Sequence, residues 1–473
     1  MPVTLRVAGL TIVAALLRLL ELGDKSLWLD ETYTAHVVRL PLRELLKTPD
    51  ASHMVLYYVL MRGWTQFAGQ GEVMLRLPSA LFAIVTVPLV CELGVQLADQ
   101  NVGLLAGLFL TVNATCIEYA QDARAYALLM MTGTMAMIIF VRTARRGSAA
   151  NAVGYIIASA GSIYAHLFAA LLIPAEWIAL PIFHSDRKTI LRLVACSVVI
   201  GIVVAPVMWI ALVTSPGQLV PMTNPLLILV PRLIAIFAGV IDIGVNLPAG
   251  IMRWWFDASG VALTGLYLFA IALAMVGAYA GRNRTEVALL TSLAFFPIVA
   301  TAFMSMIAPF FVYRYLLMSL PPFVMLAAVG VMRIASRPIR ILVIVAMMAL
   351  GIGNDYFYFR SPPLQDWRAA VHFVTAHAKS DDLIFAYPAF NAVPIKYYVG
   401  PRDLQILPRK NMTELENDLR PGATASRIWL LYALWYRLPD AVESAMRNSD
   451  RKPQQFQFPG VGVVVMEKSE DVH

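Results

Sequence analysis

The chain contains a series of apolar runs that are long enough, or nearly long enough, to cross a membrane as helices. A transmembrane helix needs about 20 mostly apolar residues. Such runs cover residues 5–22, 76–97, 102–117, 126–142, 150–166, 168–184, 190–213, 260–280, 286–307, 313–333 and 338–355. They predict an α-helical polytopic membrane protein with about 11 transmembrane helices. No small-residue cleavage site follows the first run, so we treat it as a span and not as a signal peptide.

Charged residues are unevenly distributed along the chain. Only 14% of all residues are charged and 59% are hydrophobic, whereas soluble domains are roughly 25% charged. From Tyr356 to His473, however, 27 of 118 residues are charged, about 23% and typical of a soluble domain. We therefore predict a transmembrane domain over 1–355 and a soluble domain over 356–473.

The soluble segment alternates signals for helices and strands. Helices are expected over 365–378 and 440–448, and buried strands over 383–387, 428–432 and 461–466. This alternation predicts a small C-terminal α/β domain.

Basic residues in the short loops predict how the chain crosses the membrane. They follow the fourth, sixth, eighth and tenth runs: Arg142, Arg145, Arg146, Arg187, Lys188, Arg282, Arg284, Arg333, Arg337 and Arg340. All face the cytoplasm if eleven spans begin there and 214–259 does not cross. The loop 23–75, the turn 118–125 and the C-terminal domain then lie outside, in a periplasm-like compartment. This excess of basic residues in the cytoplasmic loops accounts for the net charge of +7, so the charge does not indicate a nucleic-acid partner.

The first outer loop carries two adjacent carboxylates, Asp30 and Glu31, after the aromatic anchor Trp28. Carboxylates at a membrane surface need partners, and a held carboxylate suits general-base chemistry. The alternative is a solvated helix start, because acidic residues favour first turns. Segments 41–48 and 54–68 are expected to form surface helices. His53 directly precedes the second segment, and Tyr57, Tyr58 and Arg62 lie within it. A lone histidine is more often structural than functional.

A tight polar turn joins two spans at Asp122 and Arg124, just before Tyr126. The two charged side chains can pair with each other, or Arg124 can hold a phosphate, since guanidinium matches phosphate oxygens. A third polar point is Arg314 with Tyr315, where the arginine can bind a substrate or extend to lipid headgroups.

Four stretches, taken together, resemble the GT-C membrane glycosyltransferases of the protein O-mannosyltransferase and aminoarabinose (lipid A) transferase type. The first is Arg18 followed by S-L-W-L-D-E at 26–31, similar to the family's W-x-D-E. The others are H-M-V-L-Y-Y at 53–58 leading to R-L-P-S at 76–79, Y-A-Q-D-A-R-A-Y-A-L at 119–128, and Y-A-H at 164–166. Arg314-Tyr315 and D-W-R at 366–368 also fit. Met54-Val55 replaces a proline pair, Asp122 stands where glutamate is common, and nothing beyond about residue 380 resembles the family.

The resemblance implies an inverting glycosyltransferase in a bacterial inner membrane. It would move a sugar from a polyprenyl (undecaprenyl or decaprenyl) phosphate to a lipid A or other glycolipid, a glycan or a protein on the periplasmic face. The matching aspartate, Asp30, carries the central catalytic role. Residues that would join it are Glu31, Asp122, Arg124, Arg314, Tyr315, His53, Tyr57, Tyr58, Arg62, Tyr126 and His166.

The chemistry assigns roles to these residue types. A departing prenyl phosphate needs cations, and Arg124 is the first candidate, Arg314 the second. A hydroxyl acceptor needs a base, for which we choose Asp30, whereas an anionic phosphate acceptor would leave Asp30 to orient or bind an amino sugar. No cofactor is required, but Asp30, Glu31, Asp122 and His53 are hard ligands that can hold a divalent metal.

Two other functions fit the same sequence. A polyprenyl-phosphate-sugar binding protein or flippase would use the same lipid cavity without transfer chemistry. Acidic residues in the outer loops, and not at the midplane where transporters bind substrate, favour the enzyme. Alternatively, the C-terminal domain binds a surface partner and plays no part in catalysis.

Overall fold

The structure is a computed structural model and describes residues 2–183, 186–214, 226–241, 251–281, 284–307, 311–379, 382–400, 405–408, 427–435, 443–444, 446 and 451–468. The chain packs as two compact units. The membrane unit comprises Met1–Leu22, Leu40–Gly69 and Met74–Ser361. The tail unit comprises Gly23–Arg39, Gln70–Val73 and Pro362–His473, so two pieces of the first loop pack with the C-terminal domain. The predicted division at 355/356 stays a prediction.

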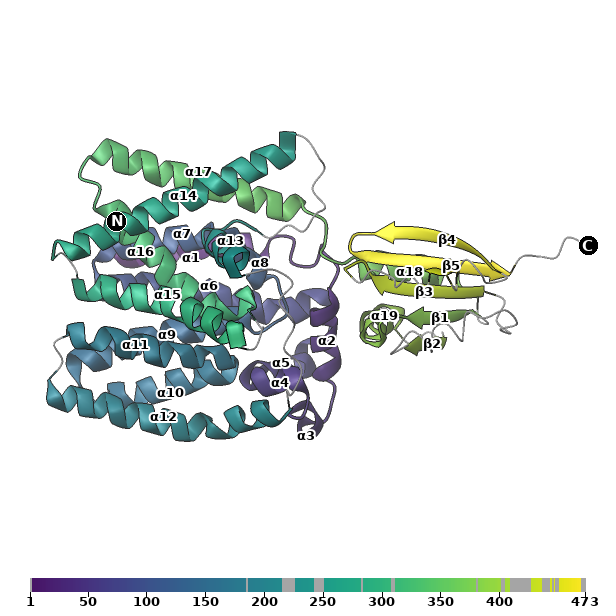
Figure 1. Cartoon of the computed structure of the whole chain (residues 1–473), viewed down its shortest axis with the longest axis horizontal. Helices are drawn as coiled ribbons and strands as arrows, with labels where there is room; N and C mark the ends of the chain where they lie inside the picture. The colour runs from purple at the N-terminus through teal and green to yellow at the C-terminus, as the bar shows by residue number, and fades with distance from the viewer. Residues whose placement is uncertain are drawn as a thin grey trace, which may run out of the picture. The chain divides into compact units, whose positions relative to one another are not determined.

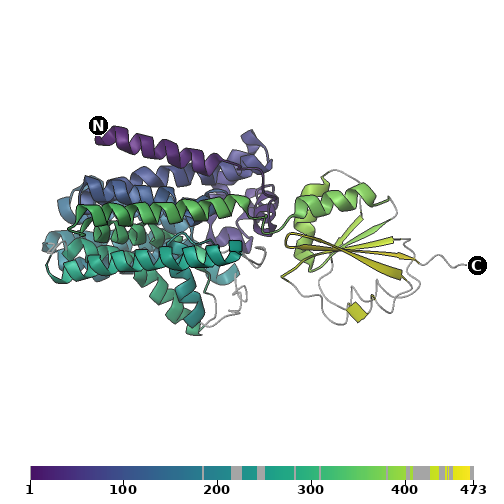
Figure 2. The same ribbon diagram turned by 90° about the horizontal axis from the view of Figure 1, so that it is seen from above.

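All regular secondary structure in the described part of the membrane unit is helical, and most of its long helices run in a common direction (Figure 1, Figure 2). Its helices are α1 (Val3–Leu19), α3 (Leu42–Leu45), α4 (Pro49–His53), α5 (Val55–Ala68), α6 (Glu72–Leu97), α7 (Gln100–Thr111), α8 (Ala114–Ala120), α9 (Tyr126–Arg146), α10 (Ala149–Ala165), η1 (Leu167–Leu171), α11 (Leu172–Ala179), η2 (Leu180–Phe183), α12 (Arg187–Thr214), α13 (Leu226–Phe237), α14 (Ile251–Tyr279), α15 (Arg284–Ile307), η3 (Tyr313–Ser319), α16 (Leu320–Met332) and α17 (Arg337–Arg360). The first two residues of α6 belong to the tail unit.

Seven helices in the described part of the chain are long and apolar enough to cross a membrane, and the pair α7–α8 makes an eighth if it is one span. The three other predicted spans correspond to α1 and α10, of 17 residues each, and to the shorter η1–α11. The chain is thus a multi-pass membrane protein by helix length and composition, while the count of eleven stays a prediction. The segment expected not to cross contains α13, whose 12 residues are too few to span the hydrocarbon.

The predicted span 102–117 is a bent pair of helices and not a straight one. Helices α7 and α8 meet at an angle of 63°. Asn113 causes the break, because its side-chain oxygen accepts the Cys116 N–H at 3.1 Å and caps α8. Its Nδ2 also donates to the Phe237 carbonyl at 3.0 Å, which ties the bend to α13.

Helix α16 forms the centre of the membrane unit. Within η3–α16, 89% of the most apolar 18-residue stretch is buried, as expected for a helix that is apolar on every side. Gly330 permits its close contact with α14, because a Cβ atom there would lie only 1.7 Å from the Ala270 carbonyl oxygen. Helices α14, α7 and α15 pack against α16.

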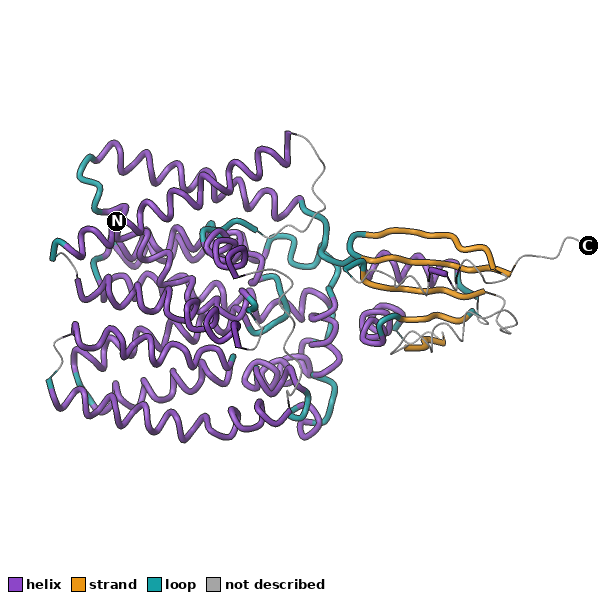
Figure 3. The backbone as a smooth tube through the Cα atoms, viewed as in Figure 1, coloured by secondary structure: helices purple, strands orange, loops and turns teal. Residues whose placement is uncertain are grey.

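The tail unit is an α/β domain, and it contains all five strands of the described chain (Figure 3). The strand order is β2-β1-β3-β5-β4, with β1 parallel to β2 and β3, and β5 antiparallel to β3 and β4. The elements are α2 (Leu29–Val37), α18 (Trp367–His377), β1 (Leu383–Ala386), η4 (Ala389–Asn391), α19 (Ala392–Val399), β2 (Gln405–Pro408), β3 (Arg427–Ala433), β4 (Arg451–Phe458) and β5 (Val461–Lys468). Helices α18 and α19 share one apolar core with the sheet.

The predicted buried strands coincide with β1, β3 and β5, and the first predicted helix with α18. The two strands that the sequence did not reveal are the sheet edges, β2 and β4. Edge strands are covered on fewer sides, so their apolar signal is weaker; β4 reads R-K-P-Q-Q-F-Q-F. The helix expected over 440–448 lies largely outside the described residues.

Candidate active site

The polar turn between α8 and α9 is held by three neighbouring helices of the membrane unit. Gln121 donates to the Leu20 carbonyl at 2.6 Å after α1. It accepts a hydrogen bond from the Tyr358 hydroxyl of α17 at 3.0 Å. Ser79 of α6 donates to the Arg124 carbonyl at 3.2 Å. The turn is therefore a fixed feature of the unit and not a loose connection.

Arg124 is the most buried cation of this turn, with 3% of its surface exposed. Its Nη1 atom lies 2.9 Å from Asp50 Oδ2 and 2.9 Å from the Tyr58 hydroxyl oxygen. Asp50 is a partner that sequence reasoning missed, because the sequence does not distinguish it from other carboxylates of the first loop. The guanidinium is thus oriented from α4 and α5, two helices of the first loop.

Tyr57 lies beside the same turn and is fully buried. Burial raises the pKa of Tyr57 well above its usual value, and the nearby Asp122 carboxylate raises it further. Its hydroxyl therefore stays protonated in the physiological range and can act as a hydrogen-bond donor. Asp122 itself is only 7% exposed, so the turn places a carboxylate and a guanidinium in the same buried region.

A group of aromatic rings lies beside the turn. Tyr126 stacks against Tyr315 with ring centroids 6.4 Å apart, and the Arg314 guanidinium lies 6.0 Å from the Tyr126 ring centre. His166 is 4.9 Å from Tyr315 and 6.1 Å from Tyr126. The predicted residues Tyr126, His166, Arg314 and Tyr315 thus form one cluster, at the start of α9, the end of α10 and η3.

His166 has a defined orientation within this cluster. Its Nδ1 atom accepts the Phe168 N–H at 3.3 Å and so caps η1, which assigns the proton of a neutral ring to Nε2. The Nε2 atom is buried and has no hydrogen-bond partner among the described residues. His53, Arg124 and Arg314 are all close enough to interact electrostatically with the ring. A buried donor with the guanidinium groups of Arg124 and Arg314 nearby fits an anionic ligand.

Two other predicted residues make contacts within the first loop. Arg62 donates to the Leu40 carbonyl oxygen. This bond ties α5 to the start of the segment Leu40–Gly69. His53 Nδ1 lies 2.8 Å from the Pro49 carbonyl oxygen. Both residues are half-buried, and their part in substrate binding stays a prediction.

Asp30 and Glu31 belong to the tail unit, in the first turn of α2. Glu31 is 1% exposed, and its Oε2 accepts the Trp28 N–H at 3.2 Å. Glu31 does lie at a helix start, as the alternative interpretation expected, but its side chain is buried and not solvated. Asp30 is half-buried. The predicted site residues accordingly fall into two groups, one in each unit.

Polar residues within the spans have structural partners. Arg18 is fully buried and donates to the Leu110 and Thr111 carbonyl oxygens at 3.0 and 3.2 Å. Glu176 accepts a hydrogen bond from Tyr155, which links α10 to α11. Among the residues that the structure describes, no group of three or more histidine, cysteine, aspartate or glutamate side chains is arranged to hold a metal ion.

A scan against models of protein families found no match, and a search of curated protein sequences found none either. Solved structures do match. ArnT from Cupriavidus metallidurans bound to undecaprenyl phosphate has a TM-score of 0.60 and 11% identity, with 98% of this chain and 97% of that chain covered. Its apo state has a TM-score of 0.61 and 12% identity, with 97% of each chain covered.

A second similar protein is the archaeal oligosaccharyltransferase AglB from Archaeoglobus fulgidus in complex with an inhibitory peptide and a dolichol-phosphate. Its TM-score is 0.56 at 11% identity, and the match covers 100% of this chain and 75% of that chain. At these identities the likeness concerns the fold.

Proposed function

Given that the chain has the fold of the GT-C membrane glycosyltransferases, we propose that it is an inverting glycosyltransferase with a polyprenyl phosphate sugar as donor. The donor lipid is an undecaprenyl or decaprenyl phosphate, and the acceptor is a cell-envelope molecule such as lipid A, another glycolipid, a glycan or a protein. Similar structures hold undecaprenyl phosphate or dolichol-phosphate, which supports a donor of this class.

The observation that carries the proposal is the buried cation at Arg124, near the orphan donor of His166. A charge of this kind is unfavourable inside a membrane protein unless it serves a ligand or a partner. Asp50 compensates it in part, but Asp50 is 34% exposed and Arg314 adds a second cation nearby. A phosphate would offer its oxygens to both guanidinium groups, whose planar geometry matches them.

The residues divide the reaction between them in this proposal. The acceptor hydroxyl attacks the anomeric carbon of the sugar, the bond from that carbon to the phosphate oxygen breaks, and the prenyl phosphate leaves with the electron pair. Arg124 and Arg314 stabilise the charge that develops on the leaving phosphate. Asp30 takes the hydroxyl proton, and inversion at the anomeric carbon follows from the single displacement.

The remaining predicted residues assist these steps. We assign Glu31 and Asp122 to the catalytic group, and Tyr315 to the donor phosphate together with the arginines. Residues that would line the substrate cavity are His53, Tyr57, Tyr58, Arg62, Tyr126 and His166. In the proposed topology the N-terminus is cytoplasmic, and the tail unit and the reaction face the periplasm of a bacterial inner membrane, in line with the basic loops.

Incorporation of labelled sugar tests this function directly. Purified protein is incubated with radiolabelled prenyl-phosphate sugars and a panel of envelope lipids, glycans and peptides. We expect one donor and acceptor pair to give a labelled product, which mass spectrometry of cells with and without the gene identifies. Saturable donor binding without any product would instead support the binding protein or flippase.

Removal of divalent metals is expected to leave transfer unchanged. The proposed leaving-group stabilisation comes from the guanidinium groups of Arg124 and Arg314, which need no metal. The measurement is the initial rate with excess EDTA, compared with the rate after Mg²⁺ or Mn²⁺ is restored. A rate that falls with EDTA and recovers with one metal would show metal dependence, for which Asp30, Asp122 and His53 are the candidate ligands.

A further inference from the structure

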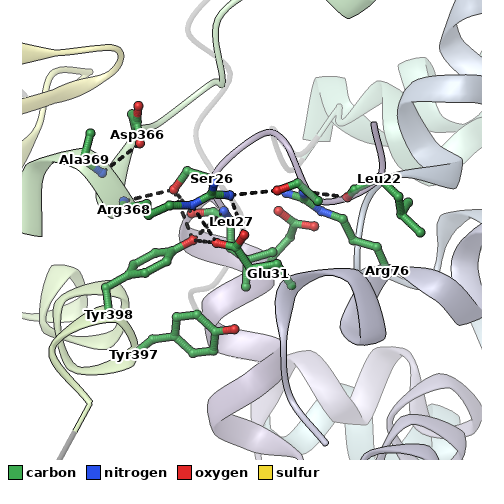
Figure 4. Close-up of polar contacts among 12 residues, drawn as sticks. Leu22, Ser26, Leu27, Glu31, Arg76, Asp366, Arg368, Ala369, Tyr397 and Tyr398 are labelled. Carbon is green, nitrogen blue, oxygen red and sulfur yellow. Dashed lines mark hydrogen bonds and ion pairs between the residues drawn. The ribbon is translucent and has the colours of Figure 1, made fainter. Parts of the chain in front are cut away.

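The backbone just before Asp30 is held by side chains of the C-terminal domain, within the tail unit (Figure 4). The Leu27 N–H donates to the Tyr398 hydroxyl oxygen at 2.7 Å. The Leu29 N–H donates to Gln365 Oε1 at 2.8 Å. Two of the three backbone amides from Leu27 to Leu29 are thus bound by residues more than 330 positions away in the sequence.

The hydroxyl of Tyr398 is itself held in place. It donates to Glu72 Oε1 at 2.5 Å, and the Ser26 Oγ lies 3.1 Å away. One donated and two accepted hydrogen bonds exhaust the capacity of a phenol. Burial raises the pKa of Tyr398 far above its usual value, so the hydroxyl keeps its proton over the working pH range of an enzyme.

The second acceptor is equally constrained. Gln365 is fully buried, and its Oε1 also accepts the Trp367 Nε1–H at 3.0 Å. Asp366, the next residue, caps α18 through the Ala369 N–H at 3.0 Å. The position of the Gln365 side-chain oxygen, Oε1, is therefore determined by the start of α18.

Arg368 joins the same network from α18. Its backbone N–H donates to Ser26 Oγ at 3.1 Å, and its guanidinium donates to the Gly23 carbonyl at 3.0 Å and forms an ion pair with Glu72. The arginine therefore fixes the start of the segment, while Tyr398 and Gln365 fix its end.

We propose that Tyr398 and Gln365 are positioning residues, a clamp through which the C-terminal domain sets the place and orientation of the Asp30 carboxylate. The inference rests on the proposed function in assigning catalysis to Asp30. Asp30 follows Leu29, the first residue of α2, so the direction of its side chain depends on the backbone that the clamp holds. A displacement of about 1 Å at a catalytic group can lower a rate by about 10²-fold. The C-terminal domain is then part of the catalytic apparatus and not only a docking module.

The test compares Tyr398→Phe with Tyr397→Phe in the full-length protein in nanodiscs. Tyr397 is a matched control: it is the adjacent residue, and its hydroxyl donates to the Gln70 carbonyl at 2.7 Å within the same unit. We expect Tyr398→Phe to lower kcat by roughly 10-fold with the donor KM unchanged. Tyr397→Phe should match the wild type in both constants.

Hydrogen exchange supplies a readout that does not depend on turnover. With Tyr398→Phe, amides in residues 23–33 should exchange faster while those of α18 and β5 keep their protection. Gln365→Met, which keeps the side-chain length but removes the strong acceptor, should have the same two effects. Unchanged exchange at 23–33, or a kcat equal to that of Tyr397→Phe, would overturn the clamp.

Failure of the proposed function gives a different pattern. If the wild type transfers no sugar from any donor, the function is wrong, and the exchange data alone decide whether Tyr398 and Gln365 hold the segment. Loss of protection throughout the tail unit in both variants would show general unfolding, which contradicts a local positioning role.

Discussion

Replacement of Asp30 by asparagine is expected to lower the transfer rate by about 10²–10⁴-fold, the usual loss when a general base is removed. Asparagine has the shape of aspartate but accepts no proton at neutral pH. The side chain is half-buried in the first turn of α2, where an amide is also tolerated, so expression and folding should be retained. The measurement is kcat with saturating donor and acceptor, beside the melting temperature of the purified variant.

Asp24→Asn is the matched control for this variant. Asp24 lies in the same loop and is exposed, so the same change in charge and size should leave the rate at the wild-type value. Near-wild-type turnover by Asp30→Asn would remove Asp30 from the mechanism.

The size of the Asp30→Asn effect also reports on the acceptor. A hydroxyl acceptor must lose a proton, whereas a phosphate acceptor is already anionic and needs no base. With a phosphate acceptor we expect Asp30→Asn to raise the KM of an amino sugar donor, because a charge partner of the amine is lost, with a smaller change in kcat.

Replacement of Arg124 by methionine is expected to lower kcat by about 10²–10³-fold, as removal of one donor to a developing oxyanion does. The guanidinium is 3% exposed, so water cannot take its place at the leaving phosphate. The partner Asp50 is 34% exposed and can be hydrated when the arginine is gone, so the fold should survive. A fall in kcat at constant KM would indicate stabilisation of the transition state, and a rise in KM alone would indicate ground-state binding.

Two further variants separate charge from geometry at this position. Arg124→Lys keeps the positive charge but lacks the planar fork, so its rate should lie between wild type and Arg124→Met. Arg142→Met is the control, because Arg142 pairs with Glu92 at 2.8 Å but is 43% exposed, and its loss should not affect the rate. Wild-type kcat in Arg124→Met would exclude Arg124 from catalysis.

The sequence predicted the long elements well because their signals are local. Runs of apolar residues located the long helices of the membrane unit, and alternating helix and strand signals located α18, β1, β3 and β5. The break in the span 102–117 was not predicted, because an asparagine within an apolar run becomes a helix break only when its side chain caps the next helix. Asn113 does so and also bonds to Phe237, a partner 124 residues away.

The candidate site was predicted as a set of residue types and not as a set of contacts. Polar residues in apolar surroundings are few, so Asp122, Arg124 and Arg314 were conspicuous in the sequence. Their partners were not, because a residue such as Asp50 in a polar loop resembles any other exposed carboxylate. The sequence also left Glu31 undecided between helix start and catalysis, and its contact with Trp28 became evident only in the folded chain.

Composition and hydrophobic periodicity by themselves determined that this is a multi-pass membrane protein with a C-terminal α/β domain. Both properties depend on how apolar each segment is, and this can be read from the sequence without knowing which distant residues are in contact. Only the tertiary structure decided that Gly23–Arg39, from the first loop, packs with the C-terminal domain. That choice depends on hydrogen bonds such as Leu27 to Tyr398, which join residues far apart in the chain and leave no periodic pattern in the sequence.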